Sequence, residues 1–150
     1  MSTLKAARNA QWPLMMEFTL NFNDTMADIN GVTRDFGSLA GGSSAATIYT
    51  FAVANLPQNA TVIGGHWVTE TAFDTAGYDV TVGDTAVTNR YLASSDLKAT
   101  ALTALVPTGY RGAGENIVIT VSTDDACTTG KATLRLWYTI QGRSNEVQTN

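Results

Sequence analysis

Apolar and polar side chains alternate along most of the chain, which is the period of a half-buried β-strand. The alternation is strictest at 116–122 (NIVITVS) and clear at 131–140 (KATLRLWYTI) and at 14–23. In 131–140 it places Leu134, Leu136, Tyr138 and Ile140 on the inner face. Further strands are expected at 46–56, 61–73, 78–82 and 86–92, with an extended stretch at 101–107.

The segments between these strands carry turn signals. Asp- and Gly-containing turns are expected at 74–77 and 83–84, and a hairpin-like loop holds Cys127 at 124–130. Residues 94–99 (SSDLKA) are typical of a capped single helical turn. The long stretch 24–44, with one short strand expected near Val32, is an interaction loop by its length.

The longest strand, 61–73, contains a Gly64-Gly65 pair. Glycine inside a strand marks a bulge or a tight bend, and such a bend would let the strand pass from one sheet to the other. Unbroken alternation would place Ile63, Trp67 and Phe73 on one face.

About eight short strands with turns every 8 to 12 residues predict a single-domain, all-β antiparallel sandwich of the jelly-roll type. An immunoglobulin-like sandwich is the nearest alternative. The domain is expected at 14–143, between an extended N-terminal arm (1–13) and a polar C-terminal tail (144–150). The arm is either a disordered terminus or a segment that orders against a neighbouring subunit.

Charge is sparse, at 15% of residues, and the formal net charge is -4. Nucleic-acid binding needs a clustered basic footprint, whereas the nine cations here are scattered along the chain, which argues against that partner. No apolar run approaches the roughly 20 residues of a membrane span, and residues 1–10 lack a signal-peptide core. A single cysteine excludes an intrachain disulfide, so synthesis in a reducing cytosol is expected.

The sequence contains no motif that indicates catalysis or metal binding. His66 and Cys127 are single residues of their kind, and no serine lies in a nucleophile-elbow context. Carboxylates gather at turns, where Asp bonds its own backbone; a calcium site built from them is the weaker alternative. We expect no enzyme activity, no cofactor and no metal.

Large aromatic residues and arginines are the remaining candidates, because both are enriched at protein interfaces. The aromatic residues either fill the core or lie exposed at an interface. The candidate interface residues are Arg8, Trp12, Arg34, Tyr110, Arg111, Trp137 and Arg143.

Several short motifs occur together within 49–143. They are Leu56-Pro57 followed by Ala60, Val62 and Gly65; the Thr-Ala-Phe-Asp turn at 71–74; Val-Gly-Asp at 82–84; and Asn-Arg-Tyr-Leu at 89–92. Gly130-Lys131 and an Ile-Gln-Gly-Arg close at 140–143 follow. This pattern resembles small structural proteins of tailed bacteriophages, in particular head decoration or cement proteins.

The resemblance implies a virion protein that binds the outside of the capsid lattice as a dimer or trimer. There it would clamp neighbouring major capsid protein subunits, after synthesis in the host bacterial cytoplasm. It implies no catalytic residues. The alternatives are a tail, neck or fibre structural protein, or a carbohydrate-binding module of the virion.

Overall fold

The computed structural model describes residues 11–39 and 47–143. These residues form ten β-strands: β1 (Leu14–Asn21), β2 (Thr25–Ala27), β3 (Thr33–Asp35), β4 (Thr47–Asn55), β5 (Ala60–Thr71), β6 (Tyr78–Asp84), β7 (Leu92–Asp96), β8 (Ala101–Ala104), β9 (Asn116–Thr123) and β10 (Lys131–Ile140). Within the described ranges there is no helix long and apolar enough to cross a membrane.

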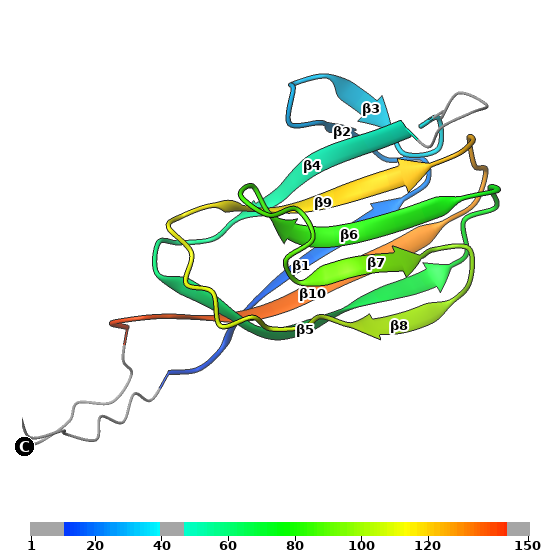
Figure 1. Ribbon diagram of the computed structural model, residues 1–150. Coiled ribbons are helices and arrows are strands. Elements are labelled where there is room, and N and C mark those ends of the chain that lie inside the picture. The colour runs from blue at the N-terminus through cyan, green and yellow to red at the C-terminus, as the bar shows by residue number, and fades with distance from the viewer. Residues whose placement is uncertain (1–10, 40–46, 144–150) are drawn as a thin grey trace, which may run out of the picture.

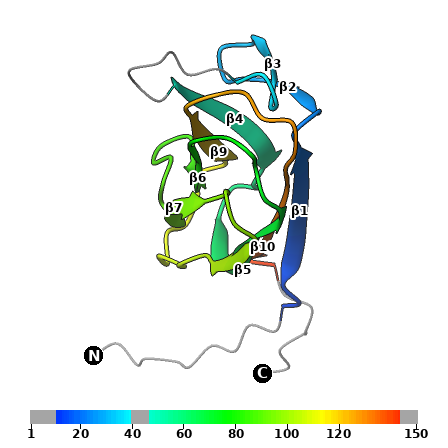
Figure 2. The same cartoon turned by 90° about the vertical axis from the view of Figure 1, so that its right-hand side faces the viewer.

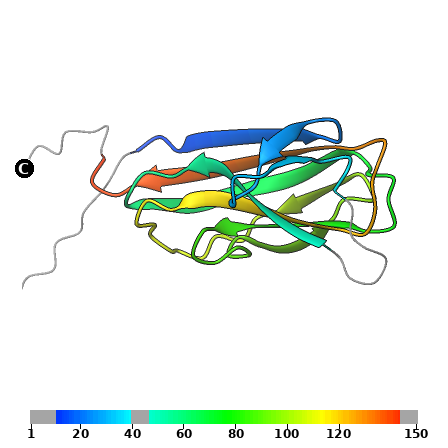
Figure 3. The ribbon, with the colours of Figure 1, turned by 90° about the horizontal axis from the view of Figure 1, so that it is seen from above.

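Eight of the strands form two four-stranded antiparallel sheets packed face to face (Figures 1 and 2). One sheet has the order β1-β10-β5-β8 and the other β4-β9-β6-β7, while β2 and β3 form a separate hairpin beside β4. The two layers are also visible from above (Figure 3). The prediction of an all-β sandwich is confirmed.

The strand pairs of the sandwich are nested. The first strand, β1, pairs with the last, β10; β4 pairs with β9, β5 with β8, and β6 with β7. The domain is therefore one long hairpin whose apex is the β6–β7 loop, wrapped so that successive pairs alternate between the sheets. This is the jelly-roll arrangement, consistent with the predicted topology.

Aromatic side chains fill the space between the sheets. The largest fully buried side chains include Trp67, Tyr78, Phe36, Phe51 and Phe73. Phe73 stacks on Tyr78 with 4.2 Å between ring centroids, and Phe36 packs against Phe51 at 4.8 Å. Each such burial contributes about 1.5–3 kcal/mol, so Phe36 fastens the segment after β3 to the core.

A β-bulge in β5 changes the expected face pattern. Trp137 of β10 faces Gly64 and Tyr138 faces Val62, so Ile63 has no partner in the register. Val62 and Trp67 are both buried although their positions differ in parity, whereas Ile63 is 42% exposed. The predicted bulge is confirmed, but the shared face of Ile63 and Trp67 and the crossing between sheets are wrong, because β5 stays in one sheet.

Four local predictions are also wrong. Residues 86–91 form a loop, and the strand follows at Leu92–Asp96, where a helical turn was expected. Asp84 Oδ1 accepts hydrogen bonds from the amides of Ala86 and Val87, which starts the turn after Asp84 and lets β6 continue through the expected 83–84 turn. The 124–130 loop joins the two sheets and closes no hairpin.

Within the described part of the 24–44 stretch, residues 24–39, there are two short strands, and the one expected near Val32 is β3. Asp28 organises the β2–β3 turn: its Oδ1 accepts from the amides of Asn30 and Val32, and its Oδ2 pairs with Arg34 at 2.9 Å. The Arg34 guanidinium also lies over the Tyr49 ring, 4.8 Å from its centroid, so the hairpin is held against β4.

Candidate interaction surface

One end of the sandwich gathers most of the predicted interface residues. We call it the terminal pole: residues 11–13, 56–59, 85–91, 105–115 and 141–143, where β1 begins and β10 ends (Figure 1). Backbone bonds from Asn59 N to Gly112 O (2.9 Å) and from Gln141 N to Asn59 O (3.0 Å) join its loops. The opposite, distal end carries the loops 72–77, 97–100 and 124–130.

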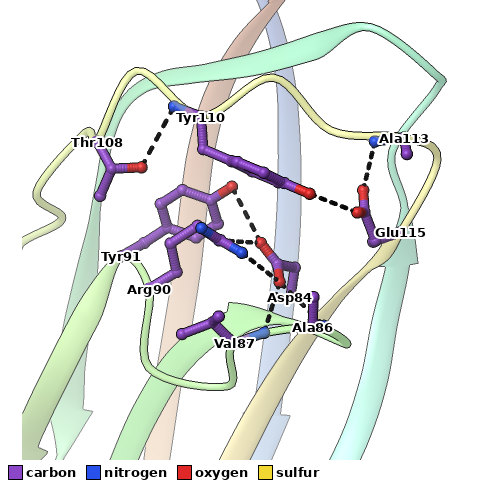
Figure 4. A network of polar contacts seen from close by, with 9 residues as sticks. All are labelled: Asp84, Ala86, Val87, Arg90, Tyr91, Thr108, Tyr110, Ala113 and Glu115. Atoms are coloured by element: carbon purple, nitrogen blue, oxygen red, sulfur yellow. Dashed lines mark hydrogen bonds and ion pairs between the residues drawn. The ribbon is translucent and has the colours of Figure 1, made fainter.

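A polar network centred on Asp84 lies beneath the loops of the terminal pole (Figure 4). Asp84, with 3% of its side chain exposed, pairs with Arg90 and accepts from the amides of Ala86 and Val87 at 3.0 and 2.8 Å. The Tyr91 hydroxyl lies 3.5 Å from Asp84 Oδ2. Burial, and next the Asp84 charge, raise the pKa of Tyr91 to about 12. The carboxylate is thus surrounded by donors.

The network continues into the 105–115 loop. The Arg90 guanidinium lies 3.6 Å from the centroid of the Tyr110 ring, and the Tyr110 hydroxyl donates to Glu115 at 2.6 Å. That bond lowers the pKa of Glu115 and raises the pKa of Tyr110. Glu115 also accepts from the Ala113 amide at 2.6 Å. The predicted interface residue Tyr110 is therefore partly engaged inside the molecule.

Arg90-Tyr91-Leu92 was expected to end a strand, and the pairing of Arg90 with Asp84 was not predicted from the sequence. A signal was available, because Val-Gly-Asp and Asn-Arg-Tyr-Leu flank one short loop. Gly83 completes the arrangement: a Cβ there would overlap the Val87 carbonyl, so the loop can fold back only over glycine. Two motifs on which the resemblance depends thus form one structural unit.

A groove of about 350 Å³ opens at the surface of the pole. It is lined by Gln11, Thr61, Arg111, Thr139, Ile140, Gln141, Gly142 and Arg143. The Gln11 side chain holds the end of β10 as a neighbouring strand would: its Nε2 donates to Ile140 O at 2.8 Å and its Oε1 accepts from Ile140 N at 2.6 Å. Nε2 also donates to Arg143 O.

None of the described residues that line this groove compensates its positive charge. Among the residues that the structure describes, five cations are paired with a carboxylate, namely Arg34, Arg90, Lys98, Lys131 and Arg135. Arg111 and Arg143 are exposed and have no ion pair within residues 11–39 and 47–143. Trp12, which follows Gln11, is 80% exposed. The structure therefore brings Trp12, Arg111 and Arg143 together at one pole.

The other predicted interface residues lie elsewhere. Arg34 is held in the β2–β3 hairpin, and Arg8 lies outside the described residues. Trp137 is on the outer face of β10, half-buried, with its ring edge-on to His66 at 5.3 Å between centroids. The Arg90 guanidinium covers one face of the Tyr110 ring, and Trp137 lies on β10 outside the terminal pole, so the three candidate aromatic residues form no single open platform.

Two surface features were not predicted from the sequence. Ile29, Val32 and Ile48 are large apolar residues that lie exposed, and the Ile29 amide donates to Thr50 O of β4. A second groove, of about 420 Å³, separates β1 from the hairpin between Phe18 and Met26. No group of three or more His, Cys, Asp or Glu that could hold a metal occurs among the residues whose positions are known.

Comparison with known proteins finds no matching family model and no matching curated sequence. Three solved structures match in fold. A chain from the acid-stable capsid of Helicobacter pylori bacteriophage KHP30 gives a TM-score of 0.54 at 15% identity, over 86% of this chain and 88% of that one. A chain of the cyanophage Pam1 capsid gives 0.54 at 18% identity, over 93% and 94%.

A chain from the capsid of Ralstonia phage GP4 gives a TM-score of 0.52 at 16% identity, over 95% of this chain and 93% of that one. In each comparison the matched region covers nearly the same percentage of both chains, so the matched chains are close to this chain in length. The likeness spans whole chains and not one domain of a larger subunit. The chain thus has the β-sandwich fold of small chains found in bacteriophage capsids.

Proposed function

We propose that this chain is a structural protein of a bacteriophage virion that binds the outside of the capsid lattice and joins neighbouring major capsid subunits. The observation that carries the proposal is the whole-chain likeness in fold to three capsid chains of similar length. A fold of this size that recurs as a separate chain in capsids suits a component added to the shell.

The architecture supports a binding role without catalysis. The rigid sandwich presents its exposed tryptophan and two arginines on one pole, and these are residue types that dominate protein interfaces. Trp12 is 80% exposed, so it is available to a partner. On the lattice the protein would form a dimer or trimer.

The test is a comparison of heads assembled with and without this protein. Heads that contain it should show its density on the outer capsid surface by electron cryomicroscopy and should survive higher temperature before releasing DNA. Restoring purified protein to deficient heads should restore that resistance. Density confined to the tail, neck or fibres, or heads of unchanged stability, would contradict the proposal.

A further inference from the structure

We propose that the groove between Arg111 and Arg143 binds a carboxylate-bearing segment of the partner protein. This inference rests on the proposed function, because it names the chemistry of the capsid surface that the terminal pole would contact. Both arginines line the groove, and none of its described lining residues is acidic. Glu115, the nearest acid in sequence to Arg111, is already engaged by Tyr110 and the Ala113 amide.

The charge of the described chain is polarised. The distal end and its flanking strand ends carry six carboxylates against two cations, Lys98 and Lys131. The carboxylates are Glu70, Asp74, Asp79, Asp96, Asp124 and Asp125. An acidic partner surface would repel the distal end and attract the terminal pole. Such complementarity fixes the orientation of approach and raises the association rate.

The groove is organised before any partner arrives. Thr61 forms a β-bridge with Arg111, and Gly112 N donates to Ala60 O at 2.8 Å, which fixes the backbone on one side. On the other side Arg143 N donates to Ile140 O at 3.2 Å, and Gln11 bonds the Arg143 carbonyl. Binding therefore orders only the two side chains, which reduces its entropic cost.

Guanidinium groups pair with carboxylates in a bidentate geometry, and an adjoining exposed tryptophan supplies apolar contact area. Trp12 stands at this pole, immediately after the groove residue Gln11. Phosphates of nucleic acid are the competing ligand for arginine. A chain with net charge -4 and two described groove arginines lacks the extended basic track that a polynucleotide requires.

The first experiment uses the full chain with Arg111→Gln and Arg143→Gln together, and deficient heads as the binding partner. Affinity at 50 mM NaCl should fall about tenfold, and the difference from wild type should shrink at 500 mM because salt screens it. The matched control is Lys98→Gln with Lys131→Gln, which removes the same charge away from the groove and should stay within about twofold. Equal losses in both double variants, or none in the groove variant, would overturn the inference.

A probe independent of the capsid separates this inference from the proposed function. A fluorescein-labelled peptide of ten glutamates should bind wild type more tightly than the groove variant in fluorescence anisotropy. A single-stranded DNA oligonucleotide should compete poorly. If wild type fails to bind heads while the peptide result holds, only the capsid role is contradicted. An identical peptide affinity for wild type and the groove variant, or a preference for the DNA, would contradict the proposed groove.

The partner carboxylate can also be identified directly. With Arg143→Lys, a carbodiimide joins the new amine to a contacting carboxylate as an amide, with loss of water to the reagent. Mass spectrometry of the complex with heads should then find a link from position 143 to an Asp or Glu of a capsid subunit. A link to the distal loop of another copy of this chain, or no link in a bound complex, would refute the assignment.

Discussion

Replacing Arg90 by methionine tests whether the buried network holds the apex of the fold. The change removes the guanidinium from Asp84, whose side chain is only 3% exposed. The carboxylate then keeps the hydrogen bonds from the amides of Ala86 and Val87 and the longer contact with the Tyr91 hydroxyl. It also removes the contact with Tyr110 at 3.6 Å. Methionine keeps the apolar stem, so packing changes little.

Breaking a buried ion pair on one side costs about 3–5 kcal/mol. The two remaining amide donors place Arg90→Met near the lower value, about 3 kcal/mol, to which the lost cation–π contact contributes up to about 1 kcal/mol. In a domain of this size that corresponds to a fall in Tm of roughly 6–12 °C. The assay is urea and thermal unfolding at pH 7, followed by circular dichroism.

The chain supplies a matched control in Arg135→Met. Arg135 pairs with Glu17 through the same Nε atom, at 2.6 Å, but the two side chains are 35% and 47% exposed. Exposed pairs contribute about 0.2–1 kcal/mol. Equal losses of stability in the two variants would refute the reasoning, because burial of the carboxylate would then not matter.

Three further predictions follow from local geometry. Gly83→Ala should destabilise the fold by about 2–3 kcal/mol in urea unfolding, since its Cβ would overlap the Val87 carbonyl; a loss below 0.5 kcal/mol contradicts this. Hydrogen bonds from Thr128 and the Thr129 amide lower the pKa of Asp74 from an ordinary 3.8 to about 2, so its stabilising effect is present above pH 4 and is lost as pH falls toward 2. Asp74→Asn should therefore show a shallower decline of Tm across that window, and parallel declines would disprove the assignment. Burial raises the pKa of Cys127 to about 11, so the native thiol should react slowly with a disulfide reagent at pH 7 and rapidly in urea; fast native labelling would contradict this.

Strands were predictable where local alternation decides them. Segments 116–122 and 131–140 match β9 and β10 almost residue for residue, because each has one strictly apolar inner face. The phase of β5 was not predictable, since the bulge at Ile63 depends on how β10 aligns beside it. Ser94-Ser95-Asp96 is equally suited to a helix cap or a strand, and pairing with β6 selects the strand.

The candidate groove was predictable in its residue types and not in its assembly. Arg111 and Arg143 were identified individually as interface arginines. Both arginines line one groove because Thr61 forms a β-bridge with Arg111 and also pairs with Thr139 of β10. No local pattern records contacts between segments so far apart. The Asp84–Arg90 unit is close in sequence, and it was missed because a strand was expected across its loop.

The nested pairing has a consequence for the order in which the molecule opens. Closing the β1–β10 ladder directly from the unfolded chain costs roughly 2 kcal/mol more in loop entropy than closing β6–β7, so the inner pairs favour the outer ones by shortening the chain between them. The hydrogen bonds between the Gln11 side chain and Ile140 lie at the open end of the outermost strand pair, so they should form last and fray first. Native-state hydrogen exchange of the β10 amides measures this order. A partner seated over Gln11 and Arg143 would close the hairpin where it is weakest and slow unfolding of the whole domain.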